Sequence, residues 1–398
     1  MSAPASEKLF TPRFFTMWAF SFTVFLSVFQ LLPTAPFHIK DLGGSTVQAG
    51  LFLGLLTFSS ALFAPLTGAI GDRIGQRTVL LIASAAIALI TLVYAFMESV
   101  TGMLALAFVQ GFFWSGMLSA SSAYMISILP QSRRAEGLGY AGLASIFALA
   151  IAPGVGFQIY RRGWFWLAMT CIALNVAMFG IATMLGTRRN NGPHPPLTLK
   201  TIVEPRLIAV AGTLFLYSFG YGGITSFSAL YADSAGIAPR GIYLTSLAIA
   251  ILLARPTLGR LGDRYGYRRV FLPCLGLVSA SLAMLALTPG RTGLIISAVT
   301  FGVGFGLAYP AFAAYVMQHV HDSRRGAAFG TLIAAFDTGI GAGSTTMGWL
   351  IQRHGYAAAF GVAAILAALA APYFLAVDRR WKLQIVDRPD SADRHPNK

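Results

Sequence analysis

The sequence predicts an all-α membrane protein with twelve transmembrane helices in two parallel six-helix halves and with both termini in the cytoplasm. Three observations lead to this prediction: the composition, the lengths of the apolar runs, and a pair of matching charged motifs. Of the 398 residues, 56% are hydrophobic and only 11% are charged. So few charges cannot cover the surface of a water-soluble protein.

Apolar runs long enough to cross a bilayer take up most of the chain. A helix needs about 20 residues to cross about 30 Å of hydrocarbon. The predicted spans are residues 14–37, 47–70, 78–97, 101–129, 136–160, 164–185, 206–232, 241–262, 270–288, 292–318, 326–352 and 355–377. They leave no room for a soluble catalytic domain, so we expect the protein to act within the bilayer.

The 29 Lys and Arg residues indicate how the spans are oriented. Cytoplasmic loops of membrane proteins carry an excess of positive charge. With a cytoplasmic N-terminus, the segments on that side hold 22 of these residues and the opposite loops hold six, while Arg255 lies within a span. This split predicts that both termini are cytoplasmic, and we expect the protein in a bacterial inner membrane. The formal net charge of +15 then indicates topology and attraction to membrane lipid, and we expect no nucleic-acid partner.

A repeat at an offset of 191 residues divides the chain into halves. It superposes the sequence from Gly68 to Arg77 on that from Gly259 to Arg268, including three charged identities. Charged residues are scarce in this chain, so the match indicates duplicated six-helix halves that start on the same side of the membrane. The expected segments are a cytoplasmic N-terminal segment (1–13), the first bundle (14–185), a cytoplasmic linker (186–205), the second bundle (206–377) and a cytoplasmic tail (378–398).

The repeated motif is Gly68-Ala-Ile-Gly71-Asp72-Arg73-Ile-Gly75-Gln76-Arg77, with its copy Gly259-Arg-Leu-Gly262-Asp263-Arg264-Tyr-Gly266-Tyr267-Arg268. Its glycines permit a tight turn between helices, and its Asp can complement the N-terminal dipole of a helix in the other half. The motif resembles the signature loop of the major facilitator superfamily, and the resemblance covers the whole chain. It implies the fold of that superfamily, alternating access, and a cytoplasmic gate formed by Gly68, Asp72, Arg73, Gly75, Arg77, Gly259, Asp263, Arg264, Gly266 and Arg268. A turn that sets topology without gating is the alternative.

Other marks of the twelve-helix drug:proton antiporters of that superfamily are present only in part. Gln110-Gly111 matches their fourth helix, but Ala107 stands where they carry an Arg. Pro153 and Gly156 keep only part of their fifth-helix pattern of glycines and proline. The resemblance to this efflux branch implies proton-driven export, and the incomplete motifs weaken that inference.

Asp337 is the one acid that lies deep within a predicted span. An ionised carboxyl is costly in hydrocarbon, and such a group suits the binding and release of a proton in each transport cycle. Arg255 lies at a comparable depth in the eighth span, and we consider both residues candidates for proton coupling. Three roles remain open for Asp337: proton coupling, a structural ion pair or hydrogen bond that Arg255 could supply, and direct substrate binding.

Polar and aromatic side chains of the first, fourth, seventh and tenth spans are candidates for binding a solute, because these helices line the central cavity in the superfamily. Buried Gln and Tyr need hydrogen-bond partners, whereas an aromatic stripe often serves only packing. The candidates are Gln30, Gln110, Trp114, Tyr124, Tyr217, Tyr221, Tyr309 and Tyr315. A cavity of these residues, which has no fixed acid, suits amphipathic or aromatic compounds.

The chain carries no motif for zinc-dependent, serine-dependent or nucleotide-dependent catalysis. We therefore expect no enzyme activity and no cofactor or metal, and uphill transport would draw on a proton gradient. The sequence predicts a monomeric, proton-coupled exporter of small amphipathic or aromatic organic compounds. A proton-coupled importer of a small metabolite is the alternative, and a receptor or scaffold without transport is a more remote one.

Overall fold

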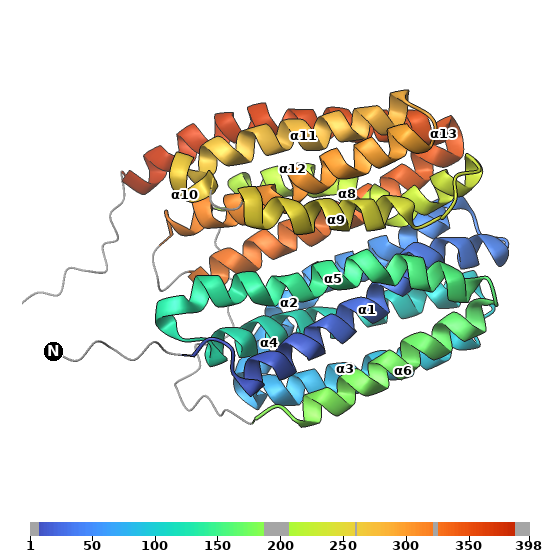
Figure 1. The fold of residues 1–398 in the computed structure, drawn as a ribbon, viewed down its shortest axis with the longest axis horizontal. Helices are drawn as coiled ribbons and strands as arrows, with labels where there is room; N and C mark the ends of the chain where they lie inside the picture. Colours follow the sequence, from blue (N-terminus) through green and yellow to red (C-terminus); the bar gives the residue numbers. More distant parts are fainter. Residues whose placement is uncertain (1–7, 187–206, 259–260, 321–324, 387–398) are drawn as a thin grey trace, which may run out of the picture.

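The computed structural model describes residues 8–186, 207–258, 261–320 and 325–386, and all regular structure in these ranges is helical (Figure 1). The prediction of an all-α protein is therefore confirmed. Ten of the described helices are long and apolar enough to cross a membrane. The protein is thus a multi-pass membrane protein.

The first half consists of six long helices and one short helical turn. The long helices are α1 (Pro12–Asp41), α2 (Thr46–Ile74), α3 (Gln76–Ala95), α4 (Val100–Ile128), α5 (Arg134–Tyr160) and α6 (Trp164–Thr183), and the 3-10 turn η1 (Gln131–Arg133) precedes α5. The second half consists of α8 (Ile208–Ser234), α9 (Ile242–Leu258), α10 (Leu261–Tyr265), α11 (Tyr267–Leu287), α12 (Arg291–Met317) and α13 (Arg325–Val386).

The number of spans depends on α9 and α13. The apolar part of α9, Ile242–Pro256, is short for a span, whereas the apolar part of α13 covers 52 residues. Gly355 has φ 80° and ψ 175°, so α13 consists of two helices joined at a kink. A stretch of that length can cross about 30 Å of hydrocarbon twice. The count of twelve spans stays a prediction.

The helix boundaries follow from capping and turn residues. Ser45 accepts a hydrogen bond from the backbone N–H of Gln48, and the Gln48 side chain accepts one from the backbone N–H of Ser45, which forms a capping box at the start of α2. Gly75 and Gly266 lie in the two copies of the motif, with φ 91° and 88°. Only glycine adopts this conformation without strain, so both motif turns require it.

The two halves lie side by side as separate bundles, coloured blue to green and yellow-green to red in Figure 1. We name the two ends of the molecule after residues of the first half: α1 meets α2 at the Asp41 end, and α2 meets α3 at the Gly75 end. The halves contact each other mainly through α2 with α13 and through α5 with α9. At the Asp41 end, the Arg240 guanidinium lies 4.9 Å from the centre of the Phe37 ring of the other half.

The predicted tail begins inside a helix. Helix α13 continues through Asp378 to Val386, and Asp378 is only 2% exposed. The boundary at residue 377 came from the end of the apolar run, but a helix does not stop where its apolar character stops. Of the predicted linker, residues 187–205 lie outside the described residues.

Candidate functional site

Asp337 joins the two halves. It lies on α13 and is 8% exposed, and its Oδ2 atom accepts a hydrogen bond of 2.9 Å from the hydroxyl of Ser60 on α2. Ser60 is itself only 1% exposed. The deepest predicted acid is therefore bonded across the interface on which alternating access would depend.

The interface around this bond is formed by small residues whose backbones approach closely. The Ser344 hydroxyl donates to the carbonyl oxygen of Gly50 at 2.7 Å. A Cβ atom at Gly50 would lie 2.4 Å from the carbonyl oxygen of Ser344, and one at Gly54 would lie 2.2 Å from the Thr345 hydroxyl. Helices α2 and α13 can pack at this distance because these positions lack side chains.

An aromatic cluster lies beside Asp337 in the second half. It consists of Tyr217 and Tyr221 on α8, Phe305 and Tyr309 on α12, and Phe336 on α13. Phe305 stacks on Tyr217 with 4.8 Å between ring centres and on Tyr221 with 4.4 Å. Tyr309 and Phe336 lie 5.2 Å apart. The structure thus brings together three of the predicted cavity residues, next to the predicted coupling residue.

Arg255 lies at the contact between α9 and α5. A Cβ atom at Gly142 of α5 would be 3.2 Å from its Nη1 atom, and its Nε atom is buried without a hydrogen-bond partner. The described residues hold no ion pair between Arg255 and Asp337. The possible structural pair is therefore not formed here, because Asp337 bonds to Ser60 instead.

The first copy of the gating motif makes local contacts. Asp72 is exposed and accepts a hydrogen bond of 3.2 Å from Gln76, while Arg77 donates to the carbonyl oxygen of Thr183 at the end of α6, at 2.8 Å. Arg73 is exposed. Among the described residues, Asp72 bonds only within its own half. Residues 321–324, which precede the predicted eleventh span, lie outside the described residues, so the cytoplasmic gate stays a prediction.

The second copy is described only in part. Gly259 and the side chain of Asp263 lie outside the described residues. The Arg264 guanidinium lies 5.2 Å from the centre of the Tyr265 ring. Arg268 donates to Asp378 of α13 at 3.1 Å, which makes an ion pair with a buried carboxylate.

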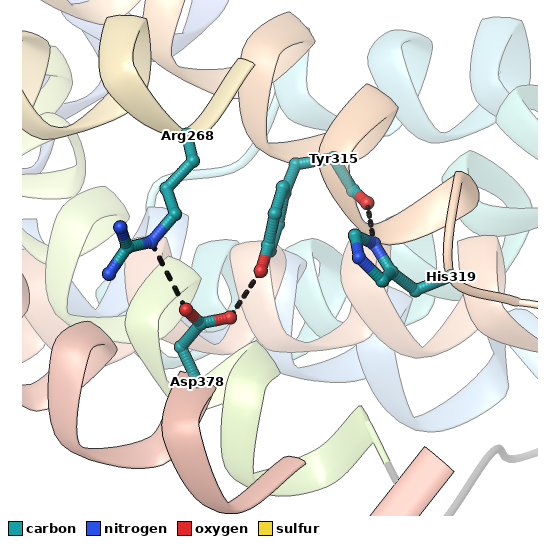
Figure 2. Close-up of polar contacts among 4 residues, drawn as sticks. All are labelled: Arg268, Tyr315, His319 and Asp378. Carbon is teal, nitrogen blue, oxygen red and sulfur yellow. Dashed lines mark hydrogen bonds and ion pairs between the residues drawn. The ribbon is translucent and has the colours of Figure 1, made fainter. Parts of the chain in front are cut away.

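The Asp378 carboxylate organises a cluster at the Gly75 end of the second half (Figure 2). One oxygen accepts from Arg268, and the other accepts from the hydroxyl of Tyr315 on α12. His319, one turn later, donates through Nδ1 to the carbonyl oxygen of Tyr315 at 2.8 Å. Tyr315 was a predicted cavity residue, but its hydroxyl is used to hold α12 to the end of α13.

The first half contains a related arrangement at the corresponding positions. Tyr124 and Tyr315 are 191 residues apart, as are Arg77 and Arg268. The Tyr124 hydroxyl accepts a hydrogen bond of 3.1 Å from the backbone N–H of Gly186, just after α6. In both halves, the motif Arg and this Tyr thus contact the end of the last helix, but only the second half supplies a carboxylate.

This difference predicts unequal effects of matched substitutions. Arg268→Gln removes a charged partner from a buried carboxylate and should lower the free energy of unfolding by about 1–3 kcal/mol. Arg77→Gln removes a bond to a helix-end carbonyl that water can replace, so its effect should be smaller. Thermal unfolding in detergent would give the two shifts in Tm. Equal shifts would contradict a special role for Asp378.

The remaining cavity candidates lie in the first half. Gln110 and Trp114 line a pocket between α1, α3, α4 and α6 that has room for about one water molecule. Gln110 accepts a hydrogen bond of 3.1 Å from the Tyr94 hydroxyl. Gln30 is 1% exposed and packs against Gly156, and its Oε1 atom has no hydrogen-bond partner. In this conformation, Gln110 therefore faces the interior of its own bundle.

Sequence reasoning did not identify Ser60 or Asp378 as site residues. Serine is common in membrane helices, and nothing in the sequence distinguishes Ser60 from the adjacent Ser59. Asp378 follows the last apolar run, where an acid is ordinarily solvated. The repeat shows that Arg268 corresponds to Arg77, but the contact of Arg77 with the end of α6 is known only from the structure.

Comparison with known proteins agrees with this architecture. A sequence model of the Major Facilitator Superfamily matches residues 17–255 and 210–394. The staphylopine export protein of Staphylococcus aureus is 25% identical over 358 residues, which cover 86% of this chain and 88% of the relative. The multidrug resistance protein MdtG of Serratia proteamaculans is 24% identical over 405 residues, which cover 96% of each chain.

Solved structures show the same fold. The crystal structure of the nucleoside transporter NupG superposes with a TM-score of 0.71 at 15% identity, covering 93% of this chain and all of that chain. The relatives are transporters rather than enzymes, as the sequence predicts. Since the family matches together extend over nearly the whole chain, the protein belongs to the major facilitator superfamily of membrane transporters.

Proposed function

We propose that this protein is a proton-coupled exporter of small amphipathic or aromatic organic compounds in a bacterial inner membrane. It works by alternating access, with twelve spans and with both termini in the cytoplasm. The proton gradient supplies the energy, and the protein acts as a monomer.

The observation that carries the proposal is the hydrogen bond between Asp337 and Ser60. A hydrogen bond to a charged carboxylate is stronger than one to a neutral group. A proton that arrives at or leaves Asp337 therefore changes the strength of a contact between the halves. This gives a direct physical route from protonation to the rocking of one half against the other.

Contacts between the halves at the Asp41 end support an arrangement that is closed at that end. At the Asp41 end, Val47 donates a backbone hydrogen bond to Gln352 of the other half at 3.2 Å, and Arg240 covers Phe37. At the Gly75 end, the described contact of Asp72 is with Gln76 of its own half. If the excess of positive charge at the Gly75 end faces the cytoplasm, the exporter is poised to take up its substrate from that side.

The direction and the substrate class have separate support. Export or drug resistance is named for two relatives, which favours outward transport. The aromatic cluster offers stacked ring faces and phenol hydroxyls, which suit compounds with an aromatic or apolar body.

A screen in proteoliposomes tests the proposal. The purified protein is reconstituted, and the movement of aromatic and amphipathic compounds is measured with a pH gradient imposed in each direction. An exporter that exchanges its substrate for protons moves substrate against the proton flux. Movement in the same direction as the protons would identify an importer. If no compound shows either net movement or counterflow, transport of this substrate class is contradicted.

A further inference from the structure

Arg255 is an intramembrane charge that the proposed proton step does not use. Its Nε atom is buried without a hydrogen-bond partner, and the ion pairs of the described residues do not include Arg255. Burying even one N–H donor of a guanidinium without an acceptor is unfavourable. A cation retained at this cost is expected to have a function.

The position of Arg255 relates it to both halves and to the aromatic cluster. It lies on α9 and approaches the backbone of α5 at Gly142, where a Cβ atom would be 3.2 Å from Nη1. Its helix α9 also packs against α12, which carries Phe305 and Tyr309 of the aromatic cluster. A compound stacked on the cluster could thus present a polar group to Arg255 at a contact between the halves.

Asp337 is the acid whose predicted depth in the membrane is closest to that of Arg255, but it does not form an ion pair with Arg255. Asp337 directly follows Phe336 of the same cluster, but its carboxylate is bonded to Ser60. The described ion pairs of the chain are Arg133–Glu136, Arg240–Asp233 and Arg268–Asp378. Among the described residues, no carboxylate pairs with Arg255, which leaves it available to an anionic group of a bound compound.

We propose that Arg255 binds the anionic group of the transported compound, and that the substrate is a small aromatic or amphipathic monoanion such as a carboxylate. This inference rests on the proposed transport function. A single charge is expected because Arg255 is the one Lys or Arg deep within a predicted span, whereas Arg206 and Arg260 lie at span ends. The planar guanidinium can bind a carboxylate through two parallel hydrogen bonds.

Binding to matched probes tests the inference without requiring transport. The probes are 1-naphthoate, 1-naphthamide and 1-naphthylmethylamine, with the corresponding benzene and indole series as smaller and more polar rings. They share a ring within each series and differ in charge. Affinity is measured by calorimetry for the full-length protein in nanodiscs. At least one carboxylate should bind about 10- to 100-fold more tightly than its amide, because a hydrogen bond to a charged group carries that preference.

Three variants test whether Arg255 causes the preference for the carboxylate over the amide. Arg255→Gln should reduce the preference for the carboxylate to less than about twofold. Arg255→Lys should keep part of the preference, because Lys retains the charge but lacks the planar pair of N–H donors of the guanidinium. Arg291→Gln, at the exposed start of α12, should leave it unchanged. Each variant is first shown to be folded by gel filtration and thermal unfolding. If Arg255→Gln does not fold, the Lys variant alone must show a reduced preference.

The inference is overturned if no carboxylate is preferred over its amide, or if the preference survives in Arg255→Gln. This outcome is distinct from failure of the proposed function. A protein that binds the carboxylate through Arg255 but shows no counterflow in liposomes would be a binding protein rather than a transporter. A protein that transports only neutral or cationic probes would keep the transport function and refute the role of Arg255.

Discussion

Asp337→Asn is expected to abolish the dependence of transport on the pH gradient while substrate counterflow continues. The amide keeps the size and the hydrogen-bonding capacity of the side chain, so the contact with Ser60 can persist. It cannot exchange a proton, so each cycle loses its coupled ion. Gradient-driven movement in proteoliposomes should fall at least about tenfold, to the level without a gradient, because no proton enters the free-energy balance.

Two further variants show whether the effect belongs to proton coupling. Glu98→Gln removes an exposed acid in the connection between α3 and α4 and should leave the gradient dependence unchanged. Ser60→Ala removes the partner across the interface but not the proton site, so transport should remain coupled although its rate changes. Unchanged gradient dependence in Asp337→Asn would remove Asp337 from the mechanism.

The sequence could predict Asp337 because an acid within an apolar span is rare and costly. It could not predict Ser60, because the partner of a side chain depends on the rotation of two helices about their axes. The same limit applies to Gln110. Its position on the fourth span was compatible with the central cavity, but rotation of α4 directs it toward Tyr94 inside the first half.

The backbone of the motif was easier to predict than its contacts. Gly75 and Gly266 have positive φ as the turn requires, because this constraint is local and survives any tertiary arrangement. The contact of Asp72 with the other half depends on the conformational state, which no local pattern encodes. Tyr315 was predicted to line a cavity because it lies near another candidate on the same helix. Periodicity gives the face of a helix on which a residue lies, but not the position of that residue along the membrane normal.

Gly50→Ala is expected to shift the protein away from the conformation described above. The new Cβ atom would lie 2.4 Å from the carbonyl oxygen of Ser344, which belongs to a helix backbone and cannot rotate away as a side chain could. The halves must then separate at the Asp41 end. Overpacking of this kind costs about 1–3 kcal/mol. If the opposite conformation escapes the clash, the equilibrium between the two should change by about 5- to 150-fold.

Spin labels report this shift directly. Cysteines introduced at the exposed positions Lys40 and Arg353 lie in different halves at the Asp41 end, and the native thiols Cys171 and Cys274 are buried and can remain. The distribution of distances between the labels should gain a longer component in Gly50→Ala. Gly180→Ala is the matched control, because a Cβ atom at Gly180 of α6 would have no neighbour within 4 Å. An unchanged distribution together with a lowered Tm would mean that α2 deforms locally, and α2 and α13 would then not form the rigid contact that alternating access requires.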